Sequence, residues 1–137
     1  MDKLVLESKI EIMLDLLNKL KEILKEHKLN KKLEEYLLYA AEKKAEEVVE
    51  LAISINQELL KSKEKVALSY YESFTSLSIF KLFSSEELKN LASTAGFRNR
   101  LAHEYLDVDS KLAILAMEKM LRIYPIYLQK IKTLISK

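Results

Sequence analysis

Apolar residues recur every three or four positions over most of the chain, which is the spacing of one face of an α-helix. The first such segment runs from Asp2 to about His27 and carries two neighbouring apolar rows. The first row is Leu6, Ile10, Met13, Leu17, Leu20 and Leu24, and the second is Ile12, Leu16 and Ile23. A stripe this wide can face both the helix's own bundle and a second copy of the chain.

A second long helix follows from the same periodicity. Asn30 is a good N-cap residue, and the apolar spacing then continues to about Leu60. The expected inward-facing row is Leu37, Ala41, Ala45, Val48, Ala52, Ile55 and Leu59. The charge-dense segment 61–65 is expected to be a short solvated connection rather than a domain boundary.

Two further helices are marked by capping residues. Ser69 can cap a short helix over 69–80, in which Phe74, Leu77 and Phe80 are expected to face inward. Ser84 and Glu87 form the S-x-x-E pattern of a capping box, so another helix is expected to begin there. Its expected apolar face is Leu88, Leu91, Ala92 and Ala95.

The last helix is expected to run to about Ser136, capped by Asp107 or Asp109. Pro125 lies inside it and predicts a kink just before this residue. Together the segments predict an all-α fold, an up-and-down helical bundle of four main helices plus a short helix, formed by one domain over residues 1–137.

Composition narrows the class of protein. With 49% hydrophobic and 32% charged residues the chain has the balance of a folded protein, and its single glycine and single proline leave little turn chemistry for β-hairpins. The chain has no cysteine, which excludes disulfides and thiolate metal sites. No apolar run approaches the roughly 18 residues of a membrane span, and acidic residues interrupt the start, so a cytoplasmic location without membrane contact is expected.

Chemically distinctive residues gather in the stretch GFRNRLAHEYLDVD, which begins at Gly96. It holds Arg98, Arg100, His103 and Tyr105 in a chain whose other basic residues are almost all lysine. Arginine grips a phosphate with a rigid fork of donors, and histidine exchanges a proton near neutral pH. The stretch is therefore a candidate site for handling phosphate and transferring protons, although a net charge of +2 alone does not identify a nucleic-acid binder.

Helical spacing constrains how these side chains can meet. Asn99 and His103 are four residues apart and share a face, whereas Arg98 lies about 140° around the helix from His103. Tyr105 returns to within about 20° of Arg98. One regular helix cannot aim both Arg98 and His103 at one atom. Either the helix is distorted after Gly96, or two copies of the chain build one cleft.

Simpler readings of these residues remain open at this point. A single histidine on a helix is more often structural than catalytic, and an arginine near it can pair with Glu104 or Asp107 on the surface. An Arg-x4-His spacing by itself is a weak signal. The two histidines, His27 and His103, are too far apart in sequence to suggest a metal ligand cluster, so no metal site is expected.

The combined string is more specific than its parts. Arg98-Asn99-x3-His103-x-Tyr105 closely resembles the signature of HEPN-domain toxins of the HepT type, in which an arginine is followed after four to six residues by His-x-Tyr. The resemblance extends over about residues 4–135, because the long second helix and the segments before the motif also fit that layout.

This resemblance implies a HEPN-like helical domain that forms a homodimer and brings two motifs into one cleft. It implies a metal-independent endoribonuclease without cofactor, the toxin of a type VII-like toxin–antitoxin pair. The implied partner is an MNT-type nucleotidyltransferase antitoxin, which transfers AMP onto the motif tyrosine and silences the toxin. By position that residue is Tyr105.

Metal-free RNA cleavage is compatible with these side chains if the RNA's own 2′-hydroxyl attacks the adjacent phosphorus. His103 would then move the proton and Arg98 would hold the phosphate. Asn99, one turn away, would orient His103 or the scissile group. Arg100 would add a phosphate contact or form a surface ion pair. The alternative is a non-catalytic helical subunit that binds nucleotide or presents substrate to a nucleotidyltransferase.

Overall fold

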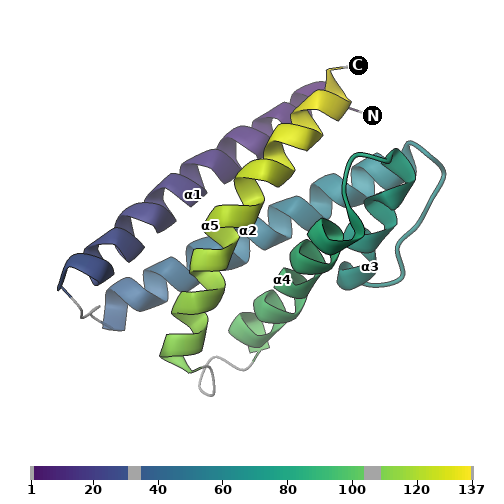
Figure 1. Ribbon diagram of the computed structural model, residues 1–137. Helices are drawn as coiled ribbons and strands as arrows, with labels where there is room; N and C mark the ends of the chain where they lie inside the picture. The colour runs from purple at the N-terminus through teal and green to yellow at the C-terminus, as the bar shows by residue number, and fades with distance from the viewer. Residues whose placement is uncertain (1, 31–34, 104–108, 137) are drawn as a thin grey trace.

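Helices dominate the computed structural model, which describes residues 2–30, 35–103 and 109–136 (Figure 1). They are α1 (Lys3–Asn30), α2 (Glu35–Lys61), α3 (Tyr70–Thr75), the 3₁₀ helix η1 (Ser76–Phe80), α4 (Ser85–His103) and α5 (Ser110–Ile135). No β-strand occurs in this described part of the chain. The predicted all-α fold with four long helices is confirmed.

The long helices pack around one apolar core. Figure 1 shows α1 and α5 side by side, with α2 crossing behind α5 and α3 lying beside α4. The start of α1 and the end of α5 lie at the same end of the bundle. None of the described helices is both long enough and apolar enough to cross a bilayer.

Only part of the wide apolar stripe on α1 packs against the other helices of its own chain. All six residues of the first predicted row are buried, with at most 6% of each exposed. In the second row Leu16 is buried and Ile23 is half-buried, but 48% of Ile12 is exposed. The apolar face of α1 therefore extends beyond what its own bundle covers.

The predicted N-cap at Asn30 is wrong. α1 continues through Asn30, and the described part of α2 begins at Glu35. No glycine or proline precedes Asn30 in this segment, so no local signal ends the first helix before this residue. An N-cap at Asn30 would require extended backbone there, but the residue is helical. Further along, α2 follows its predicted row: Leu37 is half-buried, and Ala41, Ala45, Val48, Ala52, Ile55 and Leu59 are buried.

Local capping explains where α3 and α4 begin. The Ser69 hydroxyl accepts a hydrogen bond from the Glu72 N–H at 3.1 Å. In the predicted capping box, Ser84 Oγ accepts from the Glu87 N–H at 3.0 Å while the Glu87 carboxylate accepts from the Ser84 N–H at 2.8 Å. The hydrogen bond from Lys130 and the one from Ser84 lower the pKa of Glu87. Because that pKa is lowered, the ionised Glu87 stabilises the fold at pH values above the ordinary glutamate pKa. This stabilisation is lost as the pH falls through the lowered pKa of the folded state.

The segment after Ser69 forms two short helices rather than the single predicted one. α3 gives way to η1 at Ser76, and Phe74 and Leu77 are buried while Phe80 is half-buried. The tighter turn of a 3₁₀ helix places residues three apart on one line, which suits so short an element.

A buried polar network fixes α3 against α2 and α5. The Tyr127 hydroxyl donates to Asn56 Oδ1 at 2.6 Å. The Asn56 side-chain NH₂ group in turn donates to the Ser73 hydroxyl at 3.5 Å. That hydroxyl in turn donates to the Tyr70 carbonyl at 2.7 Å. Burial raises the pKa of Tyr127, so its hydroxyl keeps its proton and remains a donor. The network ties α3, the helix that carries Tyr70, to α2 and α5.

Asp109 is the residue that caps α5, and the alternative cap Asp107 lies outside the described residues. One Asp109 carboxylate oxygen accepts from the N–H groups of Lys111 and Leu112 at 2.8 and 3.3 Å. α5 is then helical on both sides of Pro125. The expected kink stays a prediction, but the proline does not end the helix.

Candidate functional site

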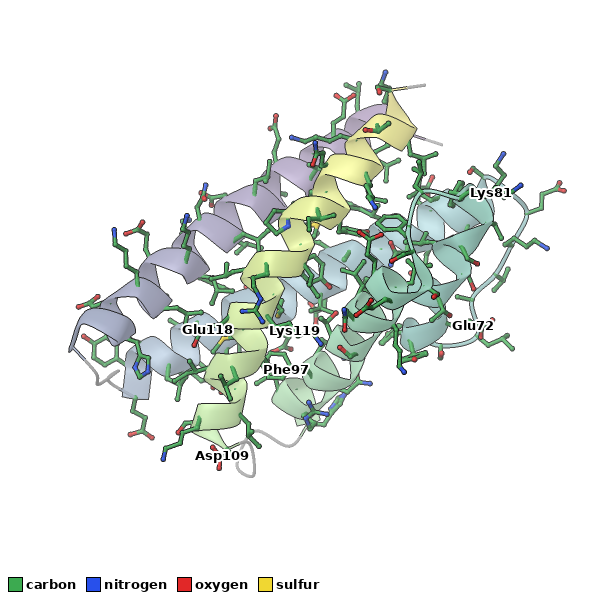
Figure 2. The ribbon with its side chains drawn as sticks, in the orientation of Figure 1. Glu72, Lys81, Phe97, Asp109, Glu118 and Lys119 are labelled. Atoms are coloured by element: carbon green, nitrogen blue, oxygen red, sulfur yellow. The ribbon has the colours of Figure 1, made fainter. Side chains whose placement is uncertain are left out.

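The described candidate residues lie in the second half of α4, after Phe97, which Figure 2 labels together with Asp109, the cap of α5. Phe97 and Leu101 are buried, with 4% and 6% exposed, and they set the inward face of this part of the helix. The side chains between them therefore point away from the core. Tyr105, the predicted AMP acceptor, lies outside the described residues.

The helix is not broken at Gly96. α4 runs without interruption from Ser85 to His103, and Gly96 has no positive φ. Of the two arrangements left open by the spacing, a distortion after Gly96 is therefore wrong. Arg98 and His103 lie on different sides of one regular helix, and among the described residues no hydrogen bond or ion pair joins them.

Arg98 is held by three neighbours. Its Nε and one terminal nitrogen donate to the same Glu50 carboxylate oxygen at 3.2 and 2.7 Å. The other terminal nitrogen donates to Asn99 Oδ1 at 3.2 Å, and the guanidinium carbon lies 5.7 Å from the centre of the Tyr70 ring. Only 18% of the Arg98 side chain is exposed. The structure thus brings Arg98 and Asn99 together, as a pair fixed from α2 and α3.

Glu50 is the neighbour of Arg98 that the sequence did not reveal. The surface pairs considered for an arginine here were Glu104 and Asp107, but the observed carboxylate comes from α2, 48 residues before Arg98. Glu50 is one of six glutamates in α2, and no spacing distinguishes it from the others. Only the packing of α4 on α2 selects it.

The Arg98–Glu50 pair forms one side of an open hollow. The hollow has a volume of about 390 Å³ and lies over α2, α3 and α4. It is lined by Glu50, Ile53, Ser54, Gln57, Tyr70 and Arg98. From the neighbouring helix, the Lys9 ammonium donates to the Ser54 hydroxyl at 2.6 Å, which adds a second cation near this surface.

The other two candidates are solvent-accessible. Arg100 is exposed, and its guanidinium carbon lies 6.0 Å from the Phe97 ring. His103 is exposed in the last turn of α4. Neither is engaged in the core, so both can meet a ligand or a second protein chain.

These groups can bind an anion and exchange a proton on neighbouring surfaces. The guanidinium and the lysine supply positive charge, Asn99 supplies an amide and His103 supplies an imidazole. In residues 2–30, 35–103 and 109–136, no group of three or more histidine, cysteine or acidic side chains is placed to hold a metal ion.

Comparison with known proteins decides the family. A family model described as ribonuclease HepT-like matches residues 13–131, which includes the entire motif from Arg98 to Tyr105. The chain belongs to this HepT-like ribonuclease family. The predicted HepT resemblance is therefore confirmed.

A relative of described activity is similar over part of its length. The tRNA nuclease HepT of Aphanizomenon flos-aquae (strain 2012/KM1/D3) is 36% identical over 88 residues. The match covers 63% of this chain and 59% of that protein, so it spans less than two thirds of the relative.

Two solved structures share the fold across almost the whole chain. One is a tri-AMPylated Shewanella oneidensis HEPN toxin in complex with an MNT antitoxin, with a TM-score of 0.84, 18% identity, and coverage of 97% of this chain and 98% of that one. The other is a mutant of the toxin–antitoxin pair MntA–HpeT, with a TM-score of 0.83, 18% identity, and coverage of 94% and 98%. At this identity the likeness establishes a HEPN-type fold.

Proposed function

We propose that this protein is a metal-independent endoribonuclease and the toxin of a type VII-like toxin–antitoxin pair. The observation that carries the proposal is membership of the HepT-like ribonuclease family, with a match that includes the complete motif. The similar protein described as a tRNA nuclease supports RNA as the class of substrate.

In the proposed reaction the 2′-hydroxyl of the RNA forms a bond to the adjacent phosphorus, and the bond from phosphorus to the 5′-oxygen breaks. One proton leaves the 2′-hydroxyl and one reaches the departing 5′-oxygen, so the products are a cyclic 2′,3′-phosphate and a 5′-hydroxyl. His103 moves a proton, and Arg98 stabilises the charge that grows on the phosphate oxygens. Asn99 orients Arg98, with which it shares a hydrogen bond of 3.2 Å, and Arg100 adds affinity for the backbone.

A homodimer completes this site. Because α4 is regular, one copy presents Arg98 and His103 in different directions, and a two-fold arrangement lets one copy supply the arginine and the other the histidine. Gly96 supports a close approach: an added Cβ would meet only the Arg100 guanidinium, at 3.7 Å, so nothing inside the described chain requires a glycine there. The exposed apolar side chain of Ile12 on α1 is also available for contact with a second chain.

We expect light scattering to give the mass of a dimer at micromolar protein, since a specific interface buries about 1,000 Å² or more. A Gly96→Leu substitution should then weaken the dimer without unfolding the protomer, because a bulky side chain fills the space that the second chain needs. A monomer at this concentration would contradict the assembly.

The proposed partner is an MNT-type nucleotidyltransferase antitoxin that transfers AMP to Tyr105. The structurally similar toxin described as tri-AMPylated and bound to an MNT antitoxin supports this pairing. The proposed acceptor follows Arg98 by seven residues, a spacing that would return it to the arginine's side if α4 continued.

Incubating the purified, unmodified protein with total RNA in EDTA tests the proposed activity. We expect cleavage to continue, because every proposed chemical role is assigned to a side chain or to the RNA. Intact RNA with or without added magnesium would favour a non-catalytic subunit of a nucleotidyltransferase instead.

A further inference from the structure

Among residues 2–30, 35–103 and 109–136, the contacts of Arg98 use only part of its guanidinium. An arginine side chain carries five N–H donors in a planar fork. One edge, formed by Nε and a terminal nitrogen, is directed at Glu50, and one N–H of the other terminal nitrogen is directed at Asn99. Two donors remain, one on each terminal nitrogen. Both terminal nitrogens of the planar group thus keep a donor, and two such donors can bind two oxygens of one phosphate.

We propose that Glu50 is the positioning residue of the RNA-cleaving site: it clamps Arg98 by one edge so that the remaining donors of the guanidinium meet the scissile phosphate. This inference rests on the function proposed above. Glu50 acts through Arg98 and does not itself contact the reacting atoms.

The geometry explains why such a clamp is needed. A free arginine side chain has four rotatable bonds and samples many orientations, and a displacement of about 1 Å at a reacting group can cost on the order of 100-fold in rate. Glu50 removes that freedom with two charge-assisted hydrogen bonds of 2.7 and 3.2 Å to a single oxygen. The Tyr70 ring limits motion from the α3 side. The hollow lined by these side chains leaves room for a phosphate.

The clamp also has an electrostatic consequence. The Glu50 carboxylate offsets the positive charge of Arg98, and so it weakens the general attraction between this surface and RNA. Geometry and charge can be separated, because glutamine keeps a carbonyl oxygen where the carboxylate oxygen accepts both hydrogen bonds, while alanine removes both the acceptor and the charge.

Steady-state kinetics on a short RNA test the proposal, with Glu50→Gln, Glu50→Ala and Glu47→Gln compared. Glu47 is an exposed glutamate of the same helix that does not line the hollow, so it is the matched control. For Glu50→Gln we expect kcat within about 3-fold of wild type and a lower KM. For Glu50→Ala we expect kcat to fall by about 10- to 100-fold without a rise in KM. Glu47→Gln should leave kcat unchanged.

Binding to an uncleavable 2′-O-methyl RNA gives a readout that is independent of the reaction. Both Glu50 variants should steepen the dependence of log affinity on log salt by about one unit or less, since one more positive charge is available to the backbone, and Arg98→Ala should make it shallower. The salt shifts report the charge of the Arg98–Glu50 pair, whereas the difference in kcat between Glu50→Gln and Glu50→Ala reports its geometry.

The outcomes separate this inference from the proposed function. If Glu50→Ala keeps kcat within twofold of wild type while Arg98→Ala is inactive, the positioning role is overturned and the nuclease assignment stands. If Glu50→Gln lowers kcat as much as Glu50→Ala does, the geometric clamp is also overturned, because the retained carbonyl oxygen would then have no effect. Wild-type protein that binds RNA with the expected salt shifts but never cuts it overturns the nuclease function and, with it, the positioning role.

Discussion

Replacing Arg98 or His103 with alanine is expected to reduce RNA cleavage by at least about 100-fold. A positioned general acid or base contributes on the order of 10²- to 10⁴-fold, and one donor to developing negative charge contributes on the order of 10²- to 10³-fold. Neither substitution removes a core residue: His103 is exposed, and the Arg98 contacts to Glu50 and Tyr70 lie at the surface hollow. Helical circular dichroism should therefore match wild type.

Single-turnover cleavage of RNA is the measurement, and Arg122→Ala is the matched control. Arg122 is the third arginine of the chain, exposed on α5 and away from the motif. Its loss should leave the rate within about twofold of wild type. Near-wild-type cleavage by Arg98→Ala or by His103→Ala would remove the proposed role of that residue.

Mixing the two inactive variants tests whether a site is shared between copies. If one chain supplies Arg98 and the other supplies His103, a mixed dimer has one intact site and one site lacking both groups. Random exchange of subunits should then restore about a quarter of wild-type activity, since half of the dimers are mixed and half of their sites are intact. If both residues acted from the same chain, mixing would restore nothing.

The second large effect is expected for the proposed switch. Tyr105→Phe should remain a ribonuclease but should no longer be silenced by its nucleotidyltransferase partner and ATP. An AMP attached to the Tyr105 hydroxyl would add bulk and at least one negative phosphate charge. That phosphate would occupy donors meant for RNA, chiefly those of Arg98, and would repel the incoming backbone. One modification would block the site without unfolding the chain.

Intact mass and RNA cleavage, measured before and after incubation with the partner and ATP, give the result. Wild type should gain the mass of one or more AMP groups and lose activity, while Tyr105→Phe should gain neither the mass nor the inhibition. Tyr71→Phe is the control, since Tyr71 is half-exposed on α3 and outside the motif. AMP adducts that still form on Tyr105→Phe and still silence it would show that the switch lies elsewhere.

Most of the fold was predictable because it depends on interactions between residues close in sequence. The buried seam of α1 and the buried row of α2 follow from helical periodicity, and the Ser84–Glu87 capping box marks the start of α4 through hydrogen bonds three residues apart. The prediction at Asn30 was wrong because it relied on a local capping preference alone. A good cap residue permits a helix start, but it does not end a preceding helix that has no breaker.

The sequence by itself determined the helical class, the family and the motif, including the fact that Arg98 and His103 cannot converge on one regular helix. Only the tertiary structure decided that the helix stays regular through Gly96 and that Arg98 is clamped by Glu50, with Tyr70 beside it. Glu50 lies 48 residues before its partner, and its selection among the glutamates of α2 depends on how α4 packs against that helix. Periodicity reports which face of a helix is buried, but it carries no information about which exposed side chains of two different helices meet.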